Sequence, residues 1–200
     1  MGGPEGPPRE PEDDRDLVER ARRGDREAFA TLVRRHQDRA FNLAFQVVRN
    51  REDALDISQE AFARAYTSLP AFKGEASFTT WLHRIVVNLA IDNLRRTRRS
   101  GTTAYDDTRA APEGGDAEPA ALEDPATVLE TKQVRALLAR GIAQLPPAQR
   151  AVLVLREIEG LSYEEISRVV GCTLGTVMSR LFYARRKLQQ VLREHFSDLR

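Results

Sequence analysis

The sequence predicts an all-α protein with two helical domains joined by a flexible linker, and three observations support this fold class. From Trp81 to Leu94 the apolar residues recur at spacings of three, four and seven, which is the stripe of one helix face. Residues 161–188 carry the capping and apolar pattern of a helix-turn-helix. Nowhere does a segment alternate apolar and polar residues convincingly over the length of a strand.

The first helices follow a polar tail. Residues 1–13 are rich in Gly, Pro and Glu and are expected to be disordered, and a first helical domain is expected over residues 14–99. Its first helix carries apolar Leu17, after which Gly24 and Asp25 break and recap the chain. The apolar side of the long second helix is formed by Phe29, Leu32, Val33, His36, Ala40, Leu43, Ala44 and Val47.

A third helix is expected over residues 52–69, between a short turn at Asn50 and Arg51 and the breaker Pro70. Its buried side would contain Ala54, Ile57, Ala61, Phe62 and Ala65. Its acidic and amide-rich side is formed by Asp53, Asp56, Gln59 and Glu60. A loop over residues 71–79 then leads to the helix that contains Trp81.

The Trp81 helix has a polar ridge beside its apolar stripe. Arg84, Asn88, Asp92 and Arg95 step along it by three or four residues. Arginine and asparagine on one face can hold phosphates and read bases. From this segment alone, a solvated amphipathic helix with a basic end is an equally good interpretation.

Residues 100–125 read as a flexible acidic linker, because large apolar residues are few and Gly, Pro, Ala and acidic residues are many. A second helical domain is expected over residues 126–200. Its first helix breaks at Pro146 and Pro147, and its second ends near Gly160. Basic segments on either side of an acidic middle suit two DNA-facing modules and a tether that avoids DNA.

The helix-turn-helix pattern depends on capping residues. Ser162 and Glu165 form a capping box, Gly171 can take the left-handed angle that ends the first helix, and Thr173 can cap the second. An exposed face of the second helix would present Ser179, Phe182, Tyr183 and Arg186. Such a face suits a recognition helix in a major groove. An ordinary helical hairpin is the weaker alternative.

Composition excludes several classes of protein. Cys172 is the single cysteine, so no intramolecular disulfide can form and a cytoplasmic location is expected. No apolar run is long enough for a transmembrane helix, and no signal peptide is expected. His36 is expected to be a satisfied core or boundary residue, and His83 either a DNA contact or an exposed spectator. Neither a metal site nor a cofactor is expected.

Four long motifs resemble the sigma-70 family of bacterial RNA polymerase sigma factors, in its extracytoplasmic-function (ECF) group. GDREAFATL at 24–32, EDALDISQEAFARAY at 52–66 and FKGEASFTTWLHRIVVNLAIDNLRR at 72–96 resemble sigma region 2. Residues 145–188, from LPPAQR to ARRKL, resemble region 4. The resemblance covers both expected domains, and the short linker fits the same group.

The resemblance implies roles for particular residues. Docking on the clamp helices of the β′ subunit of core RNA polymerase would involve Asp53, Asp56, Gln59, Glu60 and Phe62. Binding of the minus-ten element would involve Lys73, Ser77, Phe78, Thr80, Trp81, Arg84, Asn88, Arg95 and Arg96. A flipped base would be read near Asn88. Trp81 could serve as a core anchor or as a base contact, and both roles stay open here.

Reading of the minus-thirty-five element would involve Thr176, Ser179, Arg180, Phe182, Tyr183, Arg185 and Arg186. Met178 and Tyr183 stand where the family often has basic residues, and Ser167 replaces a usual alanine. The resemblance therefore implies the fold of region 4 and does not imply the exact promoter sequence that is read. The implied partners are core RNA polymerase, including its β flap, promoter DNA and an anti-sigma factor that holds the protein inactive.

Three functions can be weighed on these residues. A promoter-specificity subunit without enzymatic activity explains two DNA-reading modules on one chain, because bivalency raises affinity. A free-standing helix-turn-helix regulator would leave the region-2 motifs unexplained. A hydrolase using Asp53, Asp56 and Glu60 lacks a nucleophile or a metal context. The first function is favoured.

Overall fold

A computed structural model describes residues 13–99, 134 and 136–197, and every regular element in that part of the chain is helical. The elements are α1 (Asp14–Arg22), α2 (Arg26–Val48), α3 (Arg51–Ser68), the 3₁₀ turn η1 (Leu69–Ala71), α4 (Phe78–Arg99), α6 (Pro147–Glu157), α7 (Tyr163–Val170) and α8 (Leu174–Ser197). Residues 136–143 are helical as well. The all-α prediction is therefore confirmed. The predicted linker and most of the predicted tail lie outside the described residues.

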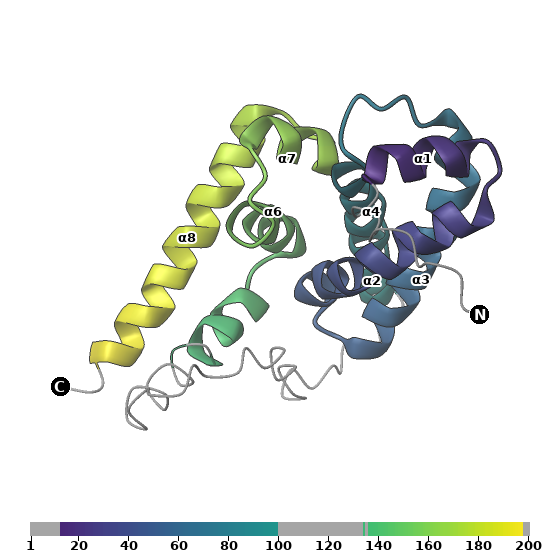
Figure 1. Cartoon of the computed structure of the whole chain (residues 1–200). Helices are drawn as coiled ribbons and strands as arrows, with labels where there is room; N and C mark the ends of the chain where they lie inside the picture. Colours follow the sequence, from purple (N-terminus) through teal and green to yellow (C-terminus); the bar gives the residue numbers. More distant parts are fainter. Residues whose placement is uncertain (1–12, 100–133, 135, 198–200) are drawn as a thin grey trace, which may run out of the picture.

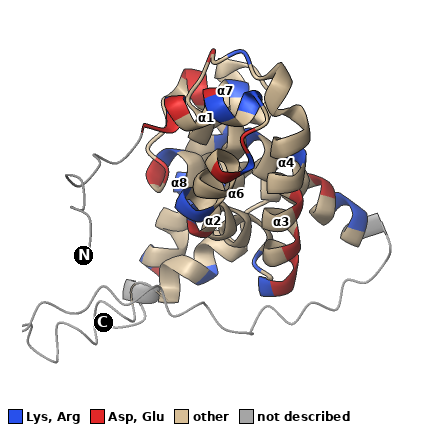
Figure 2. Ribbon diagram, turned by 45° about the vertical axis from the view of Figure 1, so that its right-hand side comes forward, with Lys and Arg blue, Asp and Glu red and all other residues tan. Residues whose placement is uncertain are grey.

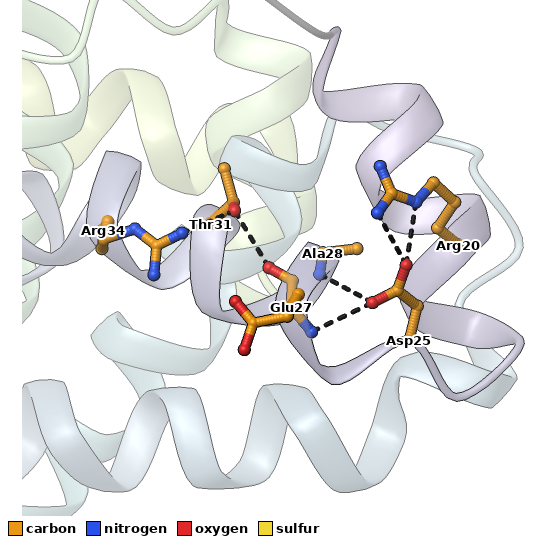
Figure 3. Close-up of polar contacts among 6 residues, drawn as sticks. All are labelled: Arg20, Asp25, Glu27, Ala28, Thr31 and Arg34. Carbon is orange, nitrogen blue, oxygen red and sulfur yellow. Dashed lines mark hydrogen bonds and ion pairs between the residues drawn. The ribbon is translucent and has the colours of Figure 1, made fainter. Parts of the chain in front are cut away.

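Capping residues fix where the first helices begin. Asp25 Oδ1 accepts hydrogen bonds from the backbone N–H groups of Glu27 (3.0 Å) and Ala28 (3.1 Å), while Arg20 Nη2 lies 2.7 Å from Oδ2 (Figure 3). These amides and then Arg20 hold the pKa of Asp25 below its usual value. Asn50 caps α3 in the same way through the N–H of Asp53 (2.9 Å). Arg51 is thus already helical and does not belong to the turn.

The first block, α1 to α4, is built around α2. Its buried residues include Leu32 and Leu43 of α2, Ile57 of α3, and Leu82 and Val86 of α4. The expected apolar side of α2 is buried, except that Phe29 and Val33 are only partly covered. The helix-periodic residues of the sequence therefore do form the core.

The two histidines of this block are both buried. His36 Nε2 lies 2.7 Å from Asp14 Oδ2, so the expectation of a satisfied core or boundary residue is confirmed. The expectation for His83 was wrong, because its side chain is 1% exposed and reaches neither solvent nor a surface where DNA could bind. Loss of water and the positive charges of Arg39 and His36 lower the pKa of His83 to about 4.

The second block contains the helix-turn-helix. Ser162 accepts from the N–H of Glu165 (3.2 Å), and the Glu165 carboxylate accepts from the N–H of Ser162 (2.8 Å), which confirms the capping box. Gly171 ends α7 with a φ of 63°, and Thr173 Oγ1 accepts from the N–H of Thr176 at the start of α8. Ile166, Val177, Leu181 and Ala184 are buried between these helices and α6.

The two blocks pack directly against each other. Figure 1 shows α6 and α7 between α8 on one side and the group α1–α4 on the other. The contacts between blocks join α6 to α2 and α7 to α4. This arrangement leaves α8 on the outer side, while α4 is partly covered by the second block.

Candidate nucleic-acid interface

Arg84 and Asn88 lie one turn apart on α4, and both side chains are exposed. Trp81, one turn earlier, is partly buried: its ring centroid lies 4.8 Å from that of Phe72 and 5.9 Å from that of Phe78. These contacts show that Trp81 anchors α4 to the core. The part of Trp81 that is not buried lines the same surface hollow as Arg84.

A surface hollow of about 510 Å³ brings several of the predicted minus-ten residues together. Its lining includes Lys73, Thr80, Trp81 and Arg84 from the loop and α4. An aromatic ring with cations beside it is a combination that holds single-stranded nucleic acid, because the ring stacks on a base and the cations pair with phosphates. The hollow also contains Arg168 and Val169 of α7, which sequence reasoning did not place here.

Two of the predicted minus-ten residues, Phe78 and Ser77, help to build the start of α4. Phe78 is 4% exposed and packs in the core, so its side chain offers no surface for DNA, and this correction follows from the first turn of α4 facing inward. Ser77 Oγ accepts from the N–H of Thr80 (3.1 Å) and lies 2.9 Å from its hydroxyl, which caps α4. Ser77 itself is exposed.

The end of α4 is basic. Arg95 and Arg96 are exposed there, and Arg95 Nη1 lies 3.6 Å from Asp92 Oδ1. The blue segment at the end of α4 marks this cluster in Figure 2. Because the Arg95 and Arg96 side chains are exposed and the ion pair of Arg95 is long, both guanidinium groups can bind DNA phosphates.

The acidic side of α3 forms a separate surface. Asp56, Gln59 and Glu60 are exposed, and Glu60 Oε1 pairs with Arg64 (2.6 Å) one turn later. Asp53 is partly buried and accepts from Asn93 Nδ2 (3.4 Å). Phe62 is 8% exposed and belongs to the core, so its inclusion in this surface was wrong: it lies on the side of α3 that packs inward.

Leu55 was missed from this surface by sequence reasoning. Its side chain is 50% exposed, beside Asp56 and one turn before Gln59. The signal was present in the sequence, because Leu55 is a large apolar residue that falls outside the helical stripe of Ala54, Ile57 and Ala61.

The outer face of α8 is exposed and mixed in character. Phe182 is 60% and Tyr183 55% exposed, their rings 5.4 Å apart, and Ser179 and Arg186 are exposed beside them. The expected face is therefore confirmed as a solvent-accessible surface. A hollow of about 690 Å³ along this helix is lined by Tyr163, Met178, Leu181, Phe182, Arg185, Arg186, Gln189, Gln190, Arg193 and Glu194.

Other predicted residues of α8 are held by neighbours. Arg185 Nη2 binds Glu157 Oε1 (2.6 Å), and this hydrogen bond raises the pKa of Arg185 above its usual value. Thr176 is partly buried, with its hydroxyl 2.9 Å from that of Thr173. Arg180 is partly buried, with Nη1 3.7 Å from Cys172 Sγ. Arg185 and Arg180 of α8 are therefore held in place by contacts with Glu157 and Cys172.

The described residues contain no group of three or more His, Cys, Asp or Glu side chains placed to hold a metal ion. Among the described helices, none combines the length and apolar character needed to cross a membrane. The surfaces on α4 and α8 are basic, aromatic and hydroxyl-bearing, a combination that is typical of nucleic-acid-binding proteins.

Comparison with known proteins identifies the family. The family model for sigma-70 region 2 matches residues 32–100, and that for sigma-70 region 4 matches residues 135–188. RNA polymerase sigma-H factor of Pseudomonas aeruginosa is 41% identical over 191 residues, covering 92% of this chain and 97% of that protein. ECF RNA polymerase sigma-E factor of Escherichia coli K12 is 38% identical, covering 90% of this chain and 96% of the relative. The chain therefore belongs to the sigma-70 family of transcription initiation factors, in the ECF group.

Solved structures agree with this assignment. CnrH, in complex with the cytosolic domain of CnrY, has a TM-score of 0.63 and 28% identity, with 90% of this chain and 97% of that chain covered. RpoE of Bartonella quintana, in complex with the anti-sigma factor NepR, has a TM-score of 0.61 and shows the same fold at 21% identity, with 82% of this chain and 96% of that chain covered.

Proposed function

We propose that this sigma factor brings core RNA polymerase to promoters through three surfaces: α3 for docking, the α4 hollow for the minus-ten strand, and the outer face of α8 for the minus-thirty-five element. The observation that carries the proposal is that one chain presents two exposed reading faces on separate blocks, together with an acidic docking helix. The protein catalyses no reaction itself, in keeping with its family of initiation factors.

The minus-ten strand would enter the hollow at Trp81. A flipped base would stack on the accessible part of the indole ring face, with Lys73 and Arg84 on the flanking phosphates. Asn88, exposed one turn beyond Arg84, can offer an amide donor and acceptor to a base edge. Arg95 and Arg96 would hold the backbone without choosing a sequence.

Docking on the β′ clamp helices would use the exposed side of α3. Asp56, Gln59 and Glu60 provide charge complementarity to a basic partner, and Leu55 provides an apolar anchor in their midst. The β flap would then receive the second block. We place Phe62 behind this surface, where it supports the helix from the core.

Control by an anti-sigma factor is part of the proposal. CnrH was solved with the cytosolic domain of CnrY, and the neighbour from Bartonella quintana with an anti-sigma factor. We infer that a comparable regulator binds this chain, which would act in the cytoplasm in a stress or envelope response.

In-vitro transcription with purified bacterial core polymerase and a promoter library tests the function. Start-site-specific transcripts that need both the core and this protein would support it. Absence of transcripts and of a complex with core, together with tight binding to duplex DNA alone, would instead indicate a free-standing regulator.

Two substitutions separate the surfaces. Asn88→Ala should abolish promoter opening and keep core binding, because Asn88 is exposed; loss of both would mean that Asn88 is structural. Asp92→Ala, one turn further along α4, is the matched control. Asp56→Arg should weaken core binding by at least about tenfold, whereas Glu19→Arg on α1 should not. Unchanged core binding by Asp56→Arg would contradict the docking surface.

A further inference from the structure

The first three turns of α8 carry exposed apolar and aromatic side chains in close succession. Leu174 is 37% exposed and Met178 49%, while Phe182 and Tyr183 are each more than half exposed. Four of the seven exposed large apolar side chains in the described part of the chain lie between Leu174 and Tyr183. Such a concentration differs from the scattered apolar residues of an ordinary protein surface and indicates a place where another molecule binds.

This stretch of α8 is the part of a helix-turn-helix that enters the major groove of DNA. In that motif the N-terminal residues of the second helix contact base edges. α8 begins at Leu174, and Tyr183 lies about 14 Å further along its axis, at roughly 1.5 Å per residue. The major groove is about 12 Å wide, so roughly this length of helix lies against base edges. The position of the exposed stretch therefore favours the bases of duplex DNA as its partner.

The arginine side chains of α8 lie beside this stretch or beyond it. Arg180 is two residues before Phe182, about 200° around the helix, and its Nη1 lies 3.7 Å from Cys172 Sγ. Arg185 is held by an ion pair of 2.6 Å with the last residue of α6. Arg186 is exposed, but it lies about 18 Å beyond the start of α8. These positions suit phosphates at the edges of the groove, whereas bidentate binding of guanine needs a guanidinium group among the base edges.

The exposed stretch is chemically suited to thymine. Thymine is the base that presents a methyl group in the major groove, at C5, and apolar side chains such as phenylalanine contact that methyl. Met178 adds a flexible, polarisable thioether that can adapt its shape to a methyl group. The rings of Phe182 and Tyr183 lie 5.4 Å apart, edge to face, so they form one continuous apolar surface. The exposed hydroxyl of Ser179 can bind several bases, so it adds little discrimination.

We propose that Met178, Phe182 and Tyr183 determine which DNA sequence the second block binds, by selecting thymine through its C5 methyl group. The selected element is then defined by A·T pairs whose thymine methyls face α8, and not by guanine held by arginine. That this element is the minus-thirty-five element rests on the proposed function, whereas the preference for the methyl group does not.

Uracil substitution tests the proposal, because uracil keeps the base pairing of thymine and lacks only the methyl group. Polymerase reconstituted with the full chain first selects sequences from a promoter library with a randomised minus-thirty-five element. Thymine should be preferred at two or more positions. Replacing one of these thymines by uracil should weaken binding about three- to fourfold, as expected for one buried methyl group, whereas uracil in the spacer should have no effect. A selected element without preferred thymine, or equal binding of thymine and uracil duplexes, would overturn the proposal.

Matched variants at exposed positions make the result specific to these side chains. Phe182→Ala should bind the thymine and uracil duplexes equally at one position, because the side chain that contacts the methyl is gone. Arg186→Gln, one turn later, should weaken binding to both duplexes and keep their ratio. Circular dichroism checks that the helices stay intact. An unchanged thymine-to-uracil ratio at every position in Phe182→Ala would overturn the role of Phe182.

A gain of guanine preference tests Met178 separately. Met178→Arg places a guanidinium group among the base edges and should create a preference for guanine at a position where the native chain has none. An unchanged selected sequence would overturn the role of Met178, because it would show that this position does not face the bases.

The free chain distinguishes this proposal from the proposed function. If no complex with core polymerase forms, the proposed function fails. Sequences are then selected from random duplexes by the full chain alone, and thymine is compared with uracil in those duplexes. A three- to fourfold preference for thymine would support the proposal, whereas equal binding, or no binding to duplex DNA, would overturn it.

Discussion

Arg150 Nη1 donates to the carbonyl of Val47 across 2.8 Å, which fastens the start of α6 to the C-terminal end of α2. Residues near the end of a helix have carbonyls without a partner in the helix itself, and a buried one needs a donor. Arg150 supplies donors to three carbonyls from one side chain. It therefore stabilises the second block and its junction with the first at once.

Arg150→Lys should lower the free energy of unfolding by about 2–4 kcal/mol. The ammonium of lysine is a compact charge on a flexible stem and cannot reproduce the planar fork that reaches carbonyls in both blocks. Guanidinium chloride denaturation, followed by circular dichroism, measures the change. Arg140→Lys, at an exposed position on the preceding helix, is the control. A loss below about 1 kcal/mol would show that Arg150 is dispensable for this junction.

Acidification should destabilise the chain through His83. Its pKa is lowered from 6.5 to about 4, so the fold favours the neutral ring. Below pH 6.5 the unfolded chain binds the proton and the folded chain does not, and stability is lost as the pH falls from 6.5 towards 4. The groups that face the ring are Arg39 and His36 of α2 and Glu159 after α6.

The measurement for His83 is unfolding at pH 7 and pH 5, where most carboxylates remain ionised. The native chain should lose roughly 2 kcal/mol more than His83→Gln between these values. Both chains retain His36, so the difference isolates His83. Equal losses in the two chains would mean that His83 is protonated without cost in the fold.

The sequence predicts local structure well here and predicts the packing of the blocks poorly. Capping at Asp25, Ser162 and Gly171 depends on neighbours within a few residues, so the pattern alone locates the helix ends. The buried side chain of His83 lies 3.4 Å from Glu159, which is 76 positions away (159 − 83) and belongs to the other block. The helical periodicity of α4 identifies an amphipathic helix with a basic end that contains a histidine. No residue near His83 in the sequence indicates that α6 and α7 pack against this helix.

In the candidate site, too, the sequence predicts the exposed helix faces better than it predicts which side chains pack inward. Phe78 and Phe62 were assigned to binding surfaces because the family motifs contain them, yet both side chains complete the core. Arg84 and Asn88 on α4, and Phe182 and Tyr183 on α8, fall on exposed faces that helix periodicity does identify. Leu55 was overlooked because an apolar residue in a helix is usually assigned to the core.

Removal of the α7 cap should weaken the helix-turn-helix locally. Ser162→Ala deletes the acceptor for the Glu165 N–H and should cost about 1 kcal/mol, whereas Ser162→Asp, which can also cap, should cost much less. Chemical denaturation of the three chains gives the comparison. Similar losses for Ala and Asp would mean that the hydroxyl acts through a contact other than the cap.

The basic end of α4 should contribute to DNA affinity without contributing to sequence choice. Arg95 and Arg96 are exposed, and the ion pair of Arg95 with Asp92 is long. Each phosphate contact releases about 0.7–0.9 of a counterion, so Arg95→Gln with Arg96→Gln should reduce the slope of log affinity against log salt by roughly 1.5. Titration of promoter DNA with the reconstituted polymerase at several potassium chloride concentrations measures this slope. Arg34→Gln, on the exposed side of α2, should leave this slope unchanged.

Relative affinities among promoter variants should be the same for the double variant as for the native chain, because phosphates carry no base identity. A change in promoter preference would instead place these arginines on base edges.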